Sequence, residues 1–88
     1  MSVYVDTMRA PYRGMIMCHM MADTHAELMF MAQQLGLKAS WLQYAGTYRE
    51  HFDIALRKKR LAVAAGAHEI DMKTLVRKMH AKREGAAP

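Results

Sequence analysis

The segment Met15–Met21 restricts the possible folds most. It reads MIMCHMM, an apolar run interrupted only by His19, and its length is typical of a buried β-strand. A helix start follows at once, because Thr24 and Glu27 have the spacing of a capping box. A buried strand that leads directly into a helix favours a sheet covered by helices.

The helix that follows is the best defined element of the sequence. Its expected buried face combines apolar positions three and four residues apart, and Gly36 is suited to the left-handed conformation that ends many helices. The residues of that face are Leu28, Met31, Ala32 and Leu35.

Weaker signals complete the pattern. Strands are expected over 2–6, 40–44 and 67–70, and a Pro- and Gly-containing loop over 9–14. Asp53 is expected to cap a second helix that ends at Gly66, and Asp71 a third. Their expected apolar faces are Ile54, Leu61, Ala64 and Ala65 in the second helix, and Met72, Leu75, Val76 and Met79 in the third.

These elements predict an α/β or α+β fold in the order β-β-α-β-α-β-α. We expect a small, partly parallel sheet of three or four strands with three helices. Residues 1–84 should form a single compact domain, and residues 85–88 a frayed tail.

Cysteine usage and hydropathy indicate the compartment. Cys18 is the single cysteine among the 88 residues, which excludes an internal disulfide and fits a reducing environment. The N-terminal segment lacks the pattern of a signal peptide, and no apolar run is long enough to span a membrane. We therefore expect a cytoplasmic protein with no membrane partner.

Charge is distributed unevenly. Residues 1–44 carry three basic and three acidic side chains, whereas residues 45–88 carry ten basic and five acidic ones, a net charge of +5. A basic half favours an anionic partner, such as a nucleotide, another phosphate-bearing ligand or nucleic acid. Solubility alone is the alternative explanation.

Several polar residues lie where a ligand site is plausible. His19 interrupts an apolar strand, and a buried imidazole needs a partner or a pocket. His51 precedes an expected helix, whose N-terminus favours an anion. Arg side chains in the loop offer two-pronged contacts to phosphate. The predicted ligand-binding residues are Arg9, Tyr12, Arg13, His19, His51, Lys59 and Arg60.

The same region offers a pool of possible metal ligands without a recognisable motif. No HExxH, Walker or GxGxxG pattern is present, so the sequence predicts no cofactor and no defined metal site. His51 and Asp53 would point to one side only if that stretch were extended. Asp6, His19 and His51 are the candidate catalytic residues, and Asp6, Asp23 and Asp53 the candidate carboxylate ligands.

A set of short motifs resembles a small bacterial and phage family known as domain of unknown function 4031. The motifs are Tyr4-Val5-Asp6, Met8-Arg9, Cys18-His19-Met20, Ala22-Asp23, Glu27-Leu28, Leu35-Gly36, Trp41-Leu42-Gln43, His51-Phe52-Asp53-Ile54, Lys59-Arg60, Ala62 and Gly66-Ala67. The resemblance covers about residues 2–70. It implies a compact cytosolic domain, often encoded by phages or prophages, and no established activity. It joins Asp6, Arg9, His19, Asp23, His51, Asp53, Lys59 and Arg60 into one constellation.

Three functions follow as hypotheses. The first is a non-enzymatic binding protein that holds, and in a phage setting sequesters, a nucleotide or nucleotide signal in a basic His/Arg pocket. The second is a metal-dependent phosphodiesterase or nuclease that uses Asp and His residues. The third is an inhibitor of a host protein that acts through a Met-rich face, a surface that a homo-oligomer would also use. The ligand hypotheses require the rings of His19 and His51 to converge with guanidinium groups in a single electropositive cavity.

Overall fold

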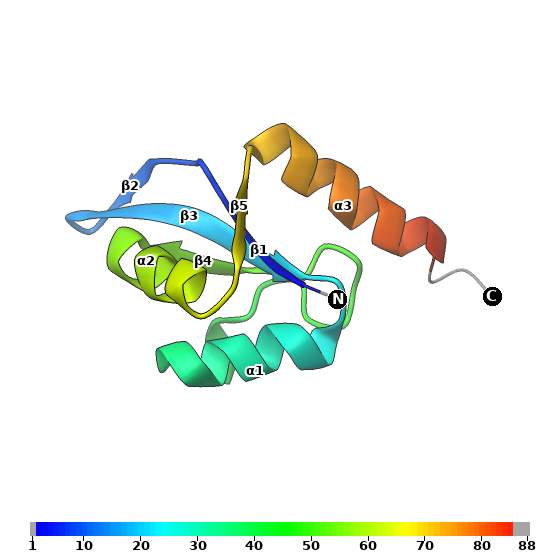
Figure 1. Cartoon of the computed structure of the whole chain (residues 1–88), viewed down its shortest axis with the longest axis horizontal. Coiled ribbons are helices and arrows are strands. Elements are labelled where there is room, and N and C mark those ends of the chain that lie inside the picture. The colour runs from blue at the N-terminus through cyan, green and yellow to red at the C-terminus, as the bar shows by residue number, and fades with distance from the viewer. Residues whose placement is uncertain (1, 86–88) are drawn as a thin grey trace.

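A computed structural model describes residues 2–85, and these form an α+β fold (Figure 1). None of the helices in this range is both long and apolar enough to cross a membrane. The predicted order of strands and helices is confirmed, with one additional short strand. The elements are β1 (Val3–Asp6), β2 (Ala10–Tyr12), β3 (Met15–Ala22), α1 (His25–Leu35), the 3-10 turn η1 (Ala39–Trp41), β4 (Phe52–Ala55), α2 (Leu56–Ala64), β5 (His68–Ile70) and α3 (Met72–Gly85).

The sheet is mixed and is built around β3. Strand β3 runs antiparallel to β1, β2 and β4, whereas β1 and β5 are parallel. Strands β2 and β1 pair with successive parts of β3, since Met17 pairs with Ala10 and Met20 with Val5. Residues 18 and 19 therefore lie where β3 changes its neighbour.

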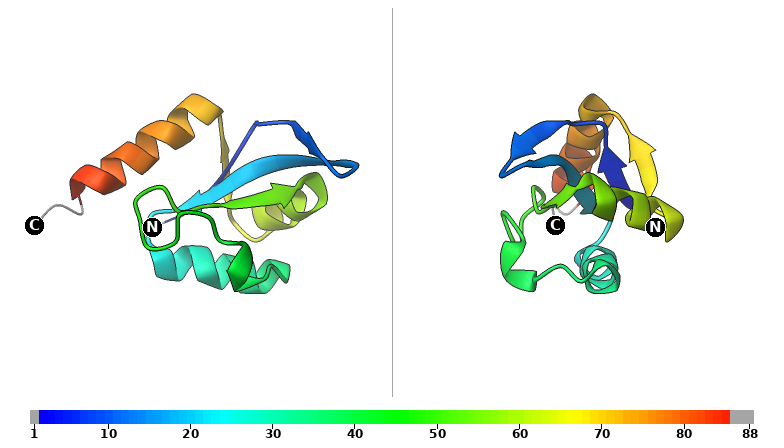
Figure 2. Two further views of the ribbon diagram at one scale, coloured as in Figure 1. Left: turned by 180° about the vertical axis from the view of Figure 1, so that it is seen from behind. Right: turned by 90° about the vertical axis from the view of Figure 1, so that its left-hand side faces the viewer.

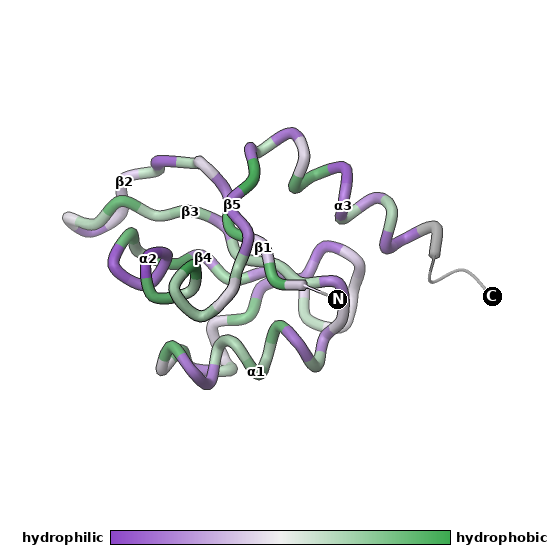
Figure 3. The backbone as a smooth tube through the Cα atoms, in the orientation of Figure 1, coloured by the Kyte–Doolittle hydropathy of each residue, from purple (hydrophilic) through white to green (hydrophobic). Residues whose placement is uncertain are grey.

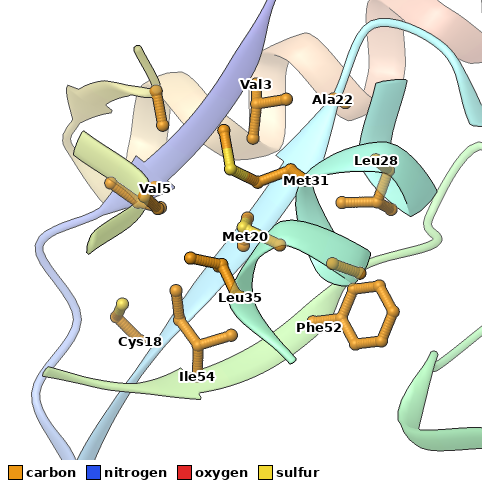
Figure 4. Close-up of a cluster of buried hydrophobic side chains, with 13 residues drawn as sticks. Val3, Val5, Cys18, Met20, Ala22, Leu28, Met31, Leu35, Phe52 and Ile54 are labelled. Atoms are coloured by element: carbon orange, nitrogen blue, oxygen red, sulfur yellow. The ribbon is translucent and has the colours of Figure 1, made fainter. Parts of the chain in front are cut away.

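The main core lies between one face of the sheet and the two helices α1 and α2. Alternate residues of the strands point toward these helices, as expected for a sheet buried on one face. Figure 4 shows Val5, Met20 and Phe52 of the strands facing Leu28 and Leu35 of α1, all of them buried. Helix α3 lies on the other side of the sheet, as the views in Figure 2 show, and it contacts β1.

Capping interactions explain where two of the helices begin and end. The Thr24 hydroxyl accepts a hydrogen bond from the Glu27 amide at 3.2 Å, and Gly36 has φ +73°, so the predicted limits of α1 are confirmed. The Asp71 carboxylate accepts from the Thr74 amide at 2.7 Å, which confirms the predicted start of α3.

Three local predictions are wrong, each because a tertiary contact outweighs a local signal. Residues 40–44 form no strand and instead contain part of η1 and an isolated bridge between Gln43 and His51. Asp53 caps no helix, since it lies inside β4, and α2 begins at Leu56 with Ala55 as its N-cap. The expected loop over 9–14 contains β2, which a two-residue turn joins to β3. Arg13 and Gly14 both have positive φ in that turn, as a type I′ hairpin requires.

The buried helix faces are narrower than expected. In α2 the buried residue is Ala62, whereas Leu61 is 49% exposed, and Ile54 belongs to β4. In α3 Leu75 is buried, while Val76 and Met72 are exposed. Figure 3 shows that α3 is largely polar and that apolar residues recur at intervals along it. Gly85 belongs to α3, and residues 86–88 of the expected tail lie outside the described residues.

The two Phe residues of the chain provide a matched test of this core. Phe52 is fully buried and Phe30 is 65% exposed. We expect Phe52→Ala to lower the free energy of unfolding by about 3–5 kcal/mol, because it removes buried apolar surface and leaves a cavity. Phe30→Ala should change it by less than about 1 kcal/mol. Urea denaturation checks both values, and equal effects of the two substitutions would contradict the assigned core.

Candidate metal centre

The site is organised around a buried carboxylate, Asp6, at the end of β1. Its Oδ1 accepts hydrogen bonds from the His19 amide at 2.9 Å and the Met8 amide at 3.3 Å. Its Oδ2 accepts from Nδ1 of the His19 ring at 2.7 Å. The side chain of Asp6 therefore supplies the acceptor for the His19 amide at the point where β3 passes from β2 to β1, and it also fixes the His19 ring.

The pair shifts both pKa values in the direction of an ion pair. Burial alone would raise the pKa of Asp6, but the hydrogen bonds from His19 and the charge of its ring hold it below the ordinary value. The hydrogen bond to Asp6 raises the pKa of His19 against the opposing effect of burial, and the negative charges of Asp6 and Asp53 raise it further. Asp6 thus remains a carboxylate, and Nδ1 of His19 keeps its proton.

Two further side chains reach the same place because residues 51–53 are extended. Residues two apart in an extended chain share a face, so His51 and Asp53 project from the same side. Asp53 pairs with His19 across the β3–β4 ladder. The rings of His19 and His51 meet edge to face with centroids 5.2 Å apart. The two imidazoles therefore converge, which is one part of what the ligand hypotheses require.

The hydrogen bonds of both rings leave a second nitrogen free. Nδ1 of His51 donates to the Arg49 carbonyl at 2.8 Å, as Nδ1 of His19 donates to Asp6. With the proton on Nδ1, each neutral ring carries a lone pair on Nε2. These nitrogens lie 4.0 Å (His19) and 3.6 Å (His51) from Oδ1 of Asp53.

Oδ1 of Asp53 is itself unsatisfied. Within residues 2–85 it is a buried oxygen without a hydrogen-bond partner, although buried polar atoms are nearly always paired. The other oxygen, Oδ2, accepts from Nε2 of Gln43 at 2.6 Å, which holds the carboxylate in place. Two lone pairs and one negatively charged oxygen thus face a common point.

The three atoms fit a divalent transition-metal ion. All lie within 4.8 Å of one another. In a tetrahedral site with bonds of about 2.0–2.1 Å, neighbouring ligand atoms are about 3.3 Å apart. Small rotations of the side chains therefore bring the set to coordination distance. Both rings also have the outer hydrogen-bond partners that metal-ligating histidines almost always have.

Sequence analysis singled out Asp6 but not the other residues that support this cluster. Gln43 was expected in a strand. The acceptor at Arg49 is a backbone carbonyl, which every residue has, so the residue type gives no signal for it. Tyr44 stacks on His51 with ring centroids 6.0 Å apart, and its φ of +54° is unusual for a bulky residue. The quoted motif Trp41-Leu42-Gln43 was the available signal for Gln43.

A large open cleft adjoins the cluster. It has a volume of about 990 Å³ and lies between the β2–β3 hairpin, residues 37–43 and the beginning of α2. Asp53 and Gln43 form part of its wall, so one ligand of the candidate metal centre borders the cleft. Tyr12, Arg13 and Arg57 also line it.

The remaining predicted site residues are dispersed. Tyr12 and Arg13 lie at the hairpin, and Arg9 is exposed just before it. Lys59 forms an ion pair with Glu69, and Arg60 is exposed on α2. Asp23 accepts hydrogen bonds from the Ser2 amide at 2.8 Å and the Tyr4 hydroxyl at 3.3 Å, which gives it a structural duty at the end of β3.

Cys18 does not contribute to the site. It is fully buried on the core face of β3, opposite His19. Burial and the nearby charge of Asp6 raise the pKa of its thiol to about 11. Because the thiol is neutral and lies on the face opposite the ring, Cys18 and His19 form no thiolate–imidazole pair.

Comparison with known proteins gives the family. A model of the family described as "Protein of unknown function (DUF4031)" matches residues 3–82. The chain belongs to this family, as its motifs indicated. No curated protein and no solved structure matches the chain.

The Asp6–His19 pair predicts the behaviour of Asp6→Asn. In this variant the amide oxygen can accept from the two backbone amides, so its NH₂ group faces Nδ1 of His19. We expect the His19 proton to move to Nε2 and the pKa of the ring to fall. NMR spectra of the metal-free protein, which resolve the ring nitrogens and their titration, measure both changes. An unaltered tautomer and pKa would contradict the assigned role of Asp6.

Stability should follow the same pair. The raised pKa of His19 means that its contribution is fully present below the unfolded value of about 6.5 and is lost as pH rises through the folded value. The lowered pKa of Asp6 means that its contribution is present above 3.8 and is lost as pH falls through the folded value. We therefore expect the difference in free energy of unfolding between wild type and Asp6→Asn to be largest between about pH 4 and about pH 6.5, with wild type the more stable. Urea denaturation over a pH series checks this, and a difference independent of pH would contradict it.

Proposed function

We propose that the protein binds one divalent transition-metal ion through His19, His51 and Asp53 and uses it to hydrolyse a phosphate ester. The observation that carries the proposal is the unsatisfied Oδ1 of Asp53 facing two imidazole nitrogens whose rings are oriented by Asp6 and the Arg49 carbonyl. A cluster with these hydrogen bonds costs free energy when it holds no cation, because the buried oxygen lacks a partner.

The ligand set supports catalysis better than a purely structural role. Structural zinc sites usually have four protein ligands, whereas catalytic sites have three and leave a position for water or substrate. The cluster offers three. Two His and one carboxylate suit zinc, and the same combination also binds iron(II).

The reaction class follows from the charges around the cluster. A bound metal lowers the pKa of its water to about 7 and polarises a phosphoryl oxygen. A metal held by His19, His51 and Asp53 would therefore supply a hydroxide nucleophile, whose oxygen would bond to phosphorus as the bond to the leaving alcohol breaks, and the alcohol would take a proton from solvent. Guanidinium groups in the adjoining cleft suit the negative charge of the phosphoryl group.

This proposal favours the metal-dependent alternative over a basic pocket without metal. The rings of His19 and His51 converge on the carboxylate of Asp53. The ion pairs of these rings are made with two carboxylates, those of Asp6 and Asp53. Binding of a phosphate group there is favourable once a divalent ion has compensated the negative charge.

A reducing compartment such as the cytoplasm is part of the proposal. Cys18 is a free thiol buried beside the site, and an oxidising compartment more often selects for disulfides in a domain of this size.

Metal titration tests the site directly. We expect metal-free protein to bind one equivalent of Zn²⁺ or Mn²⁺ in calorimetry. His51→Gln and Asp53→Asn remove ligands and should weaken binding by at least about 100-fold, whereas Asp6→Asn removes only the outer carboxylate and should weaken it by about 10–100-fold. His80→Gln, an exposed histidine on α3, is the matched control and should bind as wild type.

Hydrolysis of bis(p-nitrophenyl) phosphate tests the reaction. Release of nitrophenol should require the metal, should stop when the metal is removed with a chelator, and should return when the metal is restored. His51→Gln should abolish it and His80→Gln should leave it unchanged. One-to-one metal binding without hydrolysis would overturn the catalytic part of the proposal, and absence of specific metal binding would overturn the whole.

A further inference from the structure

The cleft beside the metal cluster combines features that point to one class of small molecule. Its volume of about 990 Å³ lies at the upper end of the range for small-molecule sites. It borders Asp53, so a ligand in it can place a reacting group next to the cluster. The position inferred below for the phosphate of that ligand rests on the proposed function.

Exposed aromatic rings provide surfaces for stacking. Trp41 is 52% exposed and Tyr12 is 53% exposed, and both line the cleft. Flat rings of this kind bind nucleobases by stacking, because every base presents a π face.

Positive charge accompanies the rings. Arg13 lies 5.3 Å from the Tyr12 ring, and the Lys38 ammonium lies 5.6 Å from the Trp41 ring. Arg57 is exposed at the beginning of α2 on the wall of the cleft. Asp53 is the acidic side chain among the lining residues that the structure describes, and in the proposed function the metal compensates it.

Lys58 also lines the cleft, but its charge has another partner. Its ammonium donates to the Leu35 carbonyl at the end of α1 at 2.6 Å. Arg13 and Arg57 are therefore the guanidinium groups on the wall that are available to a phosphate.

We infer that this cleft binds a mononucleotide or dinucleotide, with a base against Trp41 or Tyr12 and the phosphate directed toward Arg57 and the metal cluster. An aromatic, anionic ligand is the class that matches stacking rings together with guanidinium groups on the same wall. Two rings suffice for one or two bases, whereas proteins that bind longer single strands present a series of such platforms along a basic groove.

The single Trp of the chain makes the inference measurable. Because Trp41 lines the cleft, we expect adenosine monophosphate and the dinucleotide ApA to quench its fluorescence in a saturable manner. The protein is metal-free in this experiment, so binding is read separately from metal binding and hydrolysis. Adenosine, which lacks the phosphate, should bind at least about 10-fold more weakly.

Arg57→Gln and Arg60→Gln form a matched pair on α2. Both arginines are exposed, but Arg57 lines the cleft and Arg60 does not. We expect Arg57→Gln to weaken binding of adenosine monophosphate by about 10-fold and Arg60→Gln to leave it within about 2-fold of wild type. Calorimetry with Trp41→Phe, which keeps a ring but removes the signal, confirms that binding is not an artefact of the fluorophore.

Each outcome decides the inference. Saturable quenching with the Arg57 effect supports it, even if metal titration overturns the proposed function. No quenching at millimolar nucleotide in a protein that binds metal overturns it and leaves the proposed function standing. Equal losses in both Arg variants would indicate a general charge effect, and much tighter binding of a longer oligonucleotide would identify a nucleic-acid groove. Either result would overturn it.

Discussion

The fold and the candidate site share one interaction, the contact of the buried Asp6 carboxylate with His19. Strand β3 exchanges one neighbour for another at this position, and the His19 amide would otherwise lose its partner in the ladder. The same carboxylate fixes the His19 ring at 2.7 Å. A single buried carboxylate thus satisfies the backbone of the sheet through one oxygen and orients one of the proposed ligands through the other.

The elements that were predicted correctly from the sequence are those whose signals lie within the element itself. The capping pair Thr24–Glu27 and Gly36 lie within the helix they delimit, and their prediction was confirmed. Asp53 carried an equally good local signal for a helix start, yet it lies in a strand because residues 52–55 pair with residues 17–20. A pairing between segments more than thirty positions apart leaves no mark within either segment, so the prediction of a cap at Asp53 failed. The convergence of His19 and His51 was instead expected from the chemistry that the ligand hypotheses require.

The same long-range pairing explains why the sequence indicated possible metal ligands but no metal-binding motif. Recognisable metal motifs have fixed short spacings because the ligands lie on one helix or loop. Here β3 supplies His19, the residue before β4 supplies His51, and β4 itself supplies Asp53. His51 and Asp53 share a face only because Phe52 between them points into the core, so the burial of Phe52 helps to aim both ligands.

Charge balance links the two proposals. The His19 and His51 rings face carboxylates, while the guanidinium groups of Arg13 and Arg57 lie along the neighbouring cleft. An anion is repelled from the first region unless a cation occupies it, and is attracted by the second in any case. Metal and nucleotide should therefore favour each other's binding, because the ion converts the negative end of the cleft into a positive one. Asp53 lies at the junction, where one oxygen faces the cluster and the other is held by Gln43 on the wall of the cleft.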